Sequence, residues 1–349
     1  MAQQRSSGID LLRMVSMFMV VVLHVLGQGG ILAALPPHTP RWALGWVLES
    51  ACYCAVDCFG MVSGYVAHSR QFSARRCVTL WAQAAFYSAG IALLFKLFLP
   101  GSTSFRSILA ACFPVSGQQY WYFTAYFALL FFAPFLTILL ESLDRGQVKQ
   151  LLAAVVGVFC LLPLAAGRDL FYLRAGYTTL WLCVLFLVGG CVRILEEGSR
   201  RAPGWYFGGY LLCVLLTVAV KGLPGRLPRA DLFLSYTSPT VLGAALCLVL
   251  GFRALAIRSS RLLKWIARLA PLSFGVYLIH THPTVWNLLL AGRFRAYAAL
   301  PAPAMAALVL LTAAAIFLAG SSIDFLREQL FEAVLPPLFR AFARPSRCG

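Results

Sequence analysis

Three ionisable side chains in the first fifth of the chain stand in segments that are otherwise apolar. Arg13 and His24 lie within residues 9–30, IDLLRMVSMFMVVVLHVLGQGG, and Asp57 lies within residues 55–70, AVDCFGMVSGYVAHSR. An imidazole beside a carboxylate can take a proton from a hydroxyl, because the carboxylate holds the ring in one tautomer and raises its basicity. We therefore predict a hydroxyl-activating site in which His24 is the base and Asp57 its partner.

Helical geometry brings the polar residues of the first segment together. His24 follows Arg13 by about three full turns, so both side chains project from one face, and Asp10 falls within about 40° of the same line. The rise from Arg13 to His24 is about 16 Å, roughly half the thickness of the hydrocarbon. A polar group at that depth favours a functional role; the alternative is a neutral imidazole that bridges two helices.

The next segment runs antiparallel and carries Asp57 to a similar depth. Asp57 stands thirteen residues before Arg70, which we place near the cytoplasmic surface. Sequential antiparallel helices usually pack together, so we expect Asp57 within hydrogen-bond reach of His24, directly or through one water. The alternative for Asp57 is a buried partner for an arginine or tyrosine elsewhere.

The elements that carry these residues are those of a membrane protein. Hydrophobic residues make up 60% of the 349 residues, charged residues 12%, and the mean hydropathy is +0.80. Only helices can satisfy so many backbone groups in lipid, which predicts an all-α polytopic transmembrane helical bundle in a single domain, residues 1–349. About ten segments are long enough to cross the hydrocarbon: 14–35, 42–67, 78–99, 120–140, 148–166, 177–195, 205–220, 238–257, 269–290 and 300–320.

The C-terminal segment has a different pattern. Residues 321–343, SSIDFLREQLFEAVLPPLFRAFA, alternate apolar and charged side chains at helical spacing. This pattern predicts an interfacial helix on the cytoplasmic face, broken at Pro336–Pro337.

The net charge of +17 is distributed as membrane topology requires. Nineteen of the 29 lysines and arginines fall on the two termini and on alternate connections, and ten on the other connections. This bias predicts that both termini are cytoplasmic and that the positive charge serves orientation and contact with membrane lipids, not nucleic-acid binding. The eleven cysteines lie mostly inside spans, without CxxC pairs or zinc-ligand spacing, so we predict no metal site.

Four stretches carry a family resemblance. Arg13 and His24 form R-x10-H, residues 57–65 form D-x-F-x-x-x-S-G-Y, residues 120–136 read YWYFTAYFALLFFAPFL, and residues 273–283 read SFGVYLIHTHP. In this order they resemble the acyltransferase-3 family, membrane O-acyltransferases that modify cell-surface glycans. The resemblance covers residues 9–320. The stretch FPVSGQQYWYFTAYFALLFFAPFL is most similar to the subgroup that includes the membrane half of the vancomycin-resistance serine racemase.

The resemblance implies a reaction and its substrates. An acyl-CoA, usually acetyl-CoA, would arrive from the cytoplasm as donor substrate, with no tightly bound cofactor. The acyl group would pass to a hydroxyl of a cell-surface glycan or a lipid-linked sugar precursor. The protein would lie in the plasma membrane, as in a bacterial cytoplasmic membrane, with His24 as the catalytic histidine and Arg13 as its partner in the first span.

The family's R-x-x-R motif, which engages the acyl donor, corresponds here to RQFSARRCVT at residues 70–79. Arg75 and Arg76 are present, but Thr79 stands three residues after Arg76, where the motif expects a second arginine. Guanidinium groups bind phosphate bidentately, so we predict that Arg13, Arg75 and Arg76 hold the donor. The alternative is that Arg75 and Arg76 only orient the chain.

Further residues are predicted to line the substrate cavity: Asp10, Ser63, Tyr122, Tyr126 and His280. The aromatic residues at 120–126 are either an interfacial belt or a platform for the acceptor sugar. His280 lies deep enough to face a cavity, whereas His282, on the opposite side of its helix, is expected to pack.

Two other functions stay open. A transporter or exporter of a small solute, such as an amino acid, should show repeat symmetry and helices broken at mid-membrane, whereas an enzyme should consume acetyl-CoA. A sensor without chemistry would follow if the departure at Thr79 has abolished donor binding.

Overall fold

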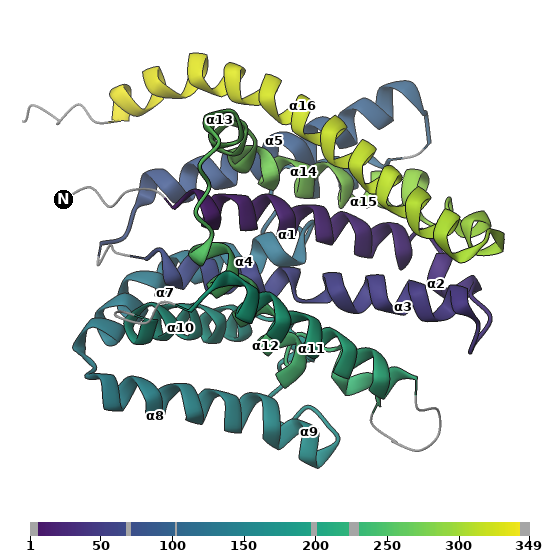
Figure 1. Ribbon diagram of the computed structural model, residues 1–349. Coiled ribbons are helices and arrows are strands. Elements are labelled where there is room, and N and C mark those ends of the chain that lie inside the picture. The colour runs from purple at the N-terminus through teal and green to yellow at the C-terminus, as the bar shows by residue number, and fades with distance from the viewer. Residues whose placement is uncertain (1–5, 68–70, 102, 197–200, 223–229, 343–349) are drawn as a thin grey trace, which may run out of the picture.

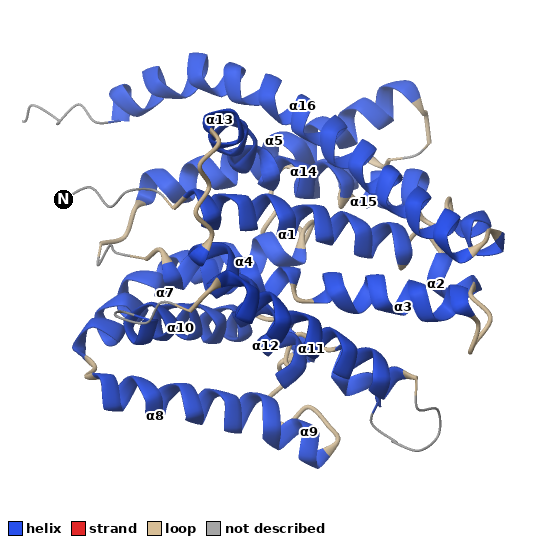
Figure 2. Ribbon diagram, viewed as in Figure 1, coloured by secondary structure: helices blue, strands red, loops and turns tan. Residues whose placement is uncertain are grey.

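The computed structural model consists of helices and connections, and no strand occurs in the part that it describes, residues 6–67, 71–101, 103–196, 201–222 and 230–342 (Figure 2). The helices lie roughly side by side (Figure 1). They are α1 (Ser7–Leu26), α2 (Ile31–Ala34), α3 (Pro40–Tyr53), α4 (Ala55–Tyr65), α5 (Ala74–Phe98), α6 (Phe105–Ala111), α7 (Trp121–Ser142), α8 (Arg145–Val156), α9 (Leu162–Ala166), α10 (Thr179–Glu196), α11 (Pro203–Lys221), α12 (Pro239–Ala254), α13 (Ser260–Leu269), α14 (Ser273–His280), α15 (Pro283–Val285) and α16 (Ala302–Phe342).

The predicted fold class is confirmed. Among the described residues, nine helical segments are long and apolar enough to cross a membrane. Large apolar side chains are exposed along α5, α7, α11 and α16, which suits contact with lipid. The protein is therefore a multi-pass membrane protein. The nine segments are Ser7–Ala34, Ala74–Phe98, Trp121–Ser142, Arg145–Ala166, Thr179–Glu196, Pro203–Lys221, Leu232–Ala254, Ser260–His280 and Ala302–Glu332.

The second predicted span, residues 42–67, is two shorter helices, α3 and α4, and is not among these nine segments. Cys54 separates α3 from α4 and caps both of them. The carbonyl of Ala51, which a continuous helix would use internally, accepts a hydrogen bond of 2.8 Å from the hydroxyl of Tyr210 on α11. A side chain from another helix thus replaces a helical hydrogen bond, and α4 begins just before Asp57.

A second interruption lies after α14. The helix ends at His280, and His282 caps the next turn by accepting a hydrogen bond from the backbone N–H of Thr284. The other ring nitrogen of His282 donates to the carbonyl of Ser88 on α5, at 3.1 Å. His282 is only 2% exposed, so it packs as expected and fixes the chain direction after α14.

The last helix differs from the prediction. Residues 321–343 were expected to form a separate interfacial helix broken at Pro336–Pro337, but α16 is continuous over 41 residues, Ala302–Phe342, and includes the last predicted span. A proline removes one hydrogen bond and can bend a helix without ending it. The beginning of α1 and the end of α16 lie on the same side of the bundle, as an even number of crossings requires (Figure 1).

Helix α1 occupies the middle of the bundle. It packs against α3, α4, α12, α13, α14 and α16, and most of its side chains are buried. Helix α4, which lies against α1, also crosses α10 closely: a Cβ added to Gly64 would fall 1.8 Å from the carbonyl oxygen of Phe186, and one added to Gly189 would fall 1.9 Å from that of Met61. These two glycines allow the backbones of α4 and α10 to come into contact, which holds α4 against α10.

Candidate active site

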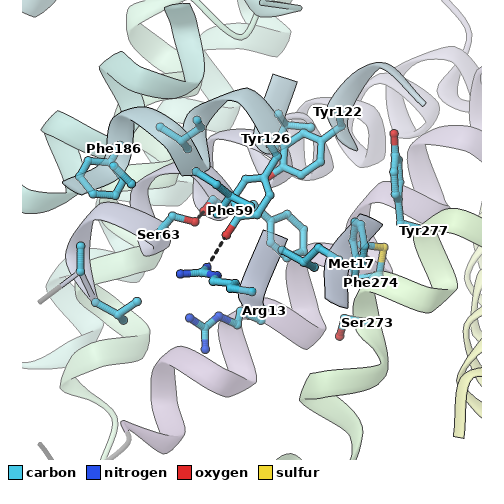
Figure 3. Close-up of a pocket in the computed structure, with 18 of the residues that line it drawn as sticks. Arg13, Met17, Phe59, Ser63, Tyr122, Tyr126, Phe186, Ser273, Phe274 and Tyr277 are labelled. Atoms are coloured by element: carbon cyan, nitrogen blue, oxygen red, sulfur yellow. Dashed lines mark hydrogen bonds between the residues drawn. The ribbon is translucent and has the colours of Figure 1, made fainter. Parts of the chain in front are cut away.

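A cavity of about 1040 Å³ opens along α1 between the helices that surround it. It follows α1 from Arg13 to His24, a rise of about 16 Å. Helices α4, α5, α7 and α14 and the connections near Tyr177 and Tyr236 supply the other walls. Figure 3 shows Arg13, Ser63 and Tyr126 gathered around one part of this space, with Tyr277 across from them.

Guanidinium groups gather in one part of the cavity wall. Arg13 on α1 forms an ion pair of 2.7 Å with Asp10, one turn earlier, which is only 3% exposed. Arg76 on α5 donates a hydrogen bond of 2.8 Å to the hydroxyl of Tyr126 on α7 (dashed line in Figure 3). Arg75 lines the same cavity. Three arginines on two helices therefore face one space, as a polyanionic ligand would require.

His24 lies farther along the same wall of α1. Its Nδ1 atom is 2.8 Å from Nε2 of His280, the last residue of α14. The Nδ1 atom of His280 is 2.6 Å from the carbonyl oxygen of Val276, one turn earlier on α14. The ring of Trp286 stands edge-on to His24, with the ring centroids 4.6 Å apart. His24 is thus held between two rings and still contributes to the cavity.

The direct hydrogen bond predicted between His24 and Asp57 is absent from the described part of the chain, and the catalytic role of Asp57 stays a prediction. Asp57 is fully buried and does not line the cavity; one carboxylate oxygen accepts a hydrogen bond of 3.1 Å from the indole N–H of Trp181 on α10. The other oxygen has no hydrogen-bond partner among the described residues. Because α4 starts only at Ala55, Asp57 lies in its first turn, where the helix dipole favours a negative charge. The hydrogen-bond partner of His24 is His280, not Asp57.

Eight of the ten predicted site residues line the cavity: Asp10, Arg13, His24, Ser63, Arg75, Arg76, Tyr122 and Tyr126. Asp57 and His280 do not; His280 is behind the wall, in contact with His24. Thr79 also lines the cavity, at the position where an arginine was expected, and Arg70 lies outside the described residues. The hydroxyl of Ser63 donates to the carbonyl of Phe59 at 2.9 Å, so only its lone pairs are available to a ligand.

Aromatic rings close another part of the cavity. Trp121 and Tyr177 have ring centroids 4.4 Å apart, and Tyr236 stacks near Trp121 at 6.2 Å. Sequence reasoning missed Tyr177 and Tyr236 because both stand in connections, where no helical period relates them to His24. Trp286 was missed for a related reason, since a π-helical turn at Trp286–Leu290 sets its direction.

The two helix interruptions have a bearing on function. Broken helices near a polar site occur in transporters, where freed backbone groups bind solutes. Irregular backbone at membrane depth is also tolerated in other membrane proteins where it is buried in protein or lines a cavity, so the interruptions alone do not identify a transporter. Here His280, which contacts His24, is the last residue before the interruption after α14, and Asp57, which bonds to Trp181, lies in the first turn after the interruption at Cys54. The arrangement offers one base and several cations to a shared space.

Comparison with known proteins decides between these classes. A family model described as an acyltransferase domain, that of the acyltransferase-3 family, matches residues 6–321. The chain belongs to the acyltransferase-3 family. The match includes all the residues of the cavity described above, and the protein is therefore a membrane acyltransferase. No curated protein and no solved structure matches the chain.

Membership of the acyltransferase-3 family indicates an acyl donor and a membrane-embedded acceptor, but it identifies neither molecule. Within the acyltransferase-3 family, the similarity to the membrane half of the serine racemase stays a prediction. The same holds for the donor, the acceptor and the role of each cavity residue.

Proposed function

We propose that this acyltransferase transfers an acyl group, acetyl in the simplest case, from cytoplasmic acyl-CoA to a hydroxyl of a cell-surface glycan or of its lipid-linked precursor, in the plasma membrane with both termini cytoplasmic. The observation that carries this proposal is the continuity of one cavity along α1, from the arginines to His24. A thioester donor that carries phosphates needs cations at its phosphates. At the other end of its extended chain, the thioester carbonyl needs a nearby base that can take the proton of the attacking hydroxyl.

The roles follow from the chemistry of the groups. Arg13, Arg75 and Arg76 would hold the donor phosphates, because a planar guanidinium binds phosphate through two parallel hydrogen bonds. Nε2 of His24 would take the proton of the acceptor hydroxyl as its oxygen attacks the thioester carbonyl. The new C–O bond forms, the C–S bond breaks, and the leaving CoA thiolate receives the proton back from His24. Tyr122 and Trp121 offer faces on which a sugar ring can stack.

The test uses purified protein in nanodiscs with radiolabelled acetyl-CoA and a crude envelope fraction as acceptor. The proposal expects CoA release coupled to label in the acceptor, and His24→Ala should lower the rate by roughly 10²–10⁴-fold, the usual loss on removal of a general base. His24→Gln should do little better, because an amide does not carry the proton. If wild type neither releases CoA nor passes label, yet moves a solute across liposomes in a His24-dependent way, the proposal fails in favour of transport.

A further inference from the structure

His280 touches the base of the site without touching the cavity. It is 2% exposed, lies at the end of α14 and does not contribute to the cavity wall. Both of its ring nitrogens are engaged, Nδ1 with the carbonyl oxygen of Val276 at 2.6 Å and Nε2 with Nδ1 of His24 at 2.8 Å. A substrate therefore meets His24 and not His280, and any influence of His280 on the reaction passes through His24.

The two hydrogen bonds together determine where the protons are. A carbonyl oxygen only accepts, so Nδ1 of His280 carries the hydrogen that points to Val276. No ion pair of His24 or His280 is present in the described part of the chain, and burial disfavours an unpaired charge, so His280 is neutral and its Nε2 has a lone pair. Nδ1 of His24 must then donate its hydrogen to His280. The remaining nitrogen of His24, Nε2, has its lone pair free.

We propose that His280 is a positioning residue that fixes His24 in the Nδ1–H tautomer and so presents Nε2 of His24 as a base to the cavity. The order of hydrogen bonds runs from Nδ1–H of His24 to His280, and from Nδ1–H of His280 to the backbone of α14. Its kinetic consequence rests on the acyl transfer proposed above, but the tautomer itself does not.

The chain of contacts also fixes the orientation of the His24 ring. The ring of Trp286 packs nearly perpendicular to it, with an interplanar angle of 82°, and the ring of His280 lies at a ring-centroid distance of 5.0 Å. A neutral imidazole, unlike a carboxylate, adds no negative charge when His24 becomes protonated. The proton on His24 is therefore retained less strongly, which suits a residue that must return it to the leaving thiolate.

Substitutions at position 280 separate positioning from general packing. His280→Ala removes the acceptor for Nδ1–H of His24, and kcat should fall about 10²-fold while the donor KM changes less than about threefold. His280→Gln places an amide oxygen near the former Nε2 position, so it should recover most of kcat. His282→Gln is the matched control, since His282 is equally buried two residues away but bonds to Ser88 and Thr284. It should leave kcat close to that of wild type.

Nitrogen NMR of ¹⁵N-histidine-labelled protein in nanodiscs tests the tautomer without any assay of activity. His24, assigned by comparison with His24→Gln, should show a protonated Nδ1 and an unprotonated Nε2 in wild type and in His280→Gln, but not in His280→Ala. A wild-type His24 protonated on Nε2 overturns the inference, as does a His280→Ala enzyme with normal kcat or a His280→Gln enzyme no better than His280→Ala. If the wild-type protein shows no acyl transfer, the proposed function is rejected, and the NMR result alone decides the tautomer of His24.

Discussion

The hydroxyl of Tyr126 on α7 lies 2.8 Å from a guanidinium nitrogen of Arg76 on α5, and both residues line the cavity. The tyrosine hydroxyl can only accept from this donor, so the bond holds the exposed side chain of Arg76 at the cavity wall. Two helices that are far apart in the sequence thereby fix one cation at the site.

The first prediction concerns this bond. Tyr126→Phe keeps the ring and removes the hydroxyl, so Arg76 loses its orientation and the donor KM should rise roughly 2- to 10-fold, the equivalent of one hydrogen bond. The value of kcat should stay within a factor of about two. Steady-state kinetics with varied acetyl-CoA measures both constants. In an Arg76→Ala background, Tyr126→Phe should have no further effect on KM, and an equal additional rise there would show that the two residues act separately.

The second prediction concerns Arg13, which Asp10 holds by an ion pair of 2.7 Å. Arg13→Lys keeps the positive charge and loses the planar fork, so the donor KM should rise if Arg13 clamps a phosphate. Arg41→Lys is the control, because Arg41 bonds to the carbonyls of Ala298 and Ala299 and lies outside the cavity. Equal KM values for wild type and Arg13→Lys would show that Arg13 does not clamp a donor phosphate and serves only membrane topology.

The third prediction follows from the bond between Asp57 and Trp181. Asp57→Asn retains an oxygen that accepts from the indole N–H, so kcat should stay within about threefold of wild type. Asp57→Leu leaves that buried donor without a partner, which should lower the free energy of unfolding by about 1–3 kcal/mol. Activity and thermal unfolding in detergent measure the two effects. A 100-fold loss of kcat in Asp57→Asn at unchanged stability would contradict this prediction and show that Asp57 takes part in catalysis.

The sequence predicted some elements of the fold correctly and others not. Long apolar runs identified the spans, because length and hydropathy alone determine which segments cross lipid. The interruption at Cys54 was not predicted, and the residue that bonds to the carbonyl of Ala51 beside it, Tyr210, is on a helix far away in the sequence. Helices α1 and α4 do pack together as expected, but Asp57, in the first turn of α4, bonds to Trp181 on α10.

The cavity residues on α1 were predictable because one helical period relates Asp10, Arg13 and His24. The contact between His24 and His280 was not, because it depends on how α1 and α14 dock and on where α14 ends. For the last helix, the pair Pro336–Pro337 predicted a break, but α16 continues through it. A single lost hydrogen bond per proline is a local cost that flanking turns can absorb.

The fourth prediction concerns the crossing of α4 and α10. A Cβ at position 64 would meet the backbone of Phe186, which does not move aside as a flexible side chain would. Gly64→Ala should therefore destabilise the protein by about 1–3 kcal/mol and displace Ser63 and Phe59 from the cavity wall. Gly90→Ala on α5 is the matched control, because nothing lies within 4 Å of its added Cβ. If Gly64→Ala unfolds at the same temperature as Gly90→Ala, the close crossing is not what holds α4.

The central claim is that a donor bound at the arginines passes its acyl group through His24 to an acceptor hydroxyl. The most direct measurement uses proteoliposomes of uniform orientation, established by protease accessibility of a tag at Gly349, with radiolabelled acetyl-CoA on the side of that tag and the glycan acceptor on the other. We predict label in the acceptor and free CoA on the donor side in equal amounts, with both lost in His24→Ala. Label transfer that persists in His24→Ala, or that occurs only with donor and acceptor on one side, would contradict the account.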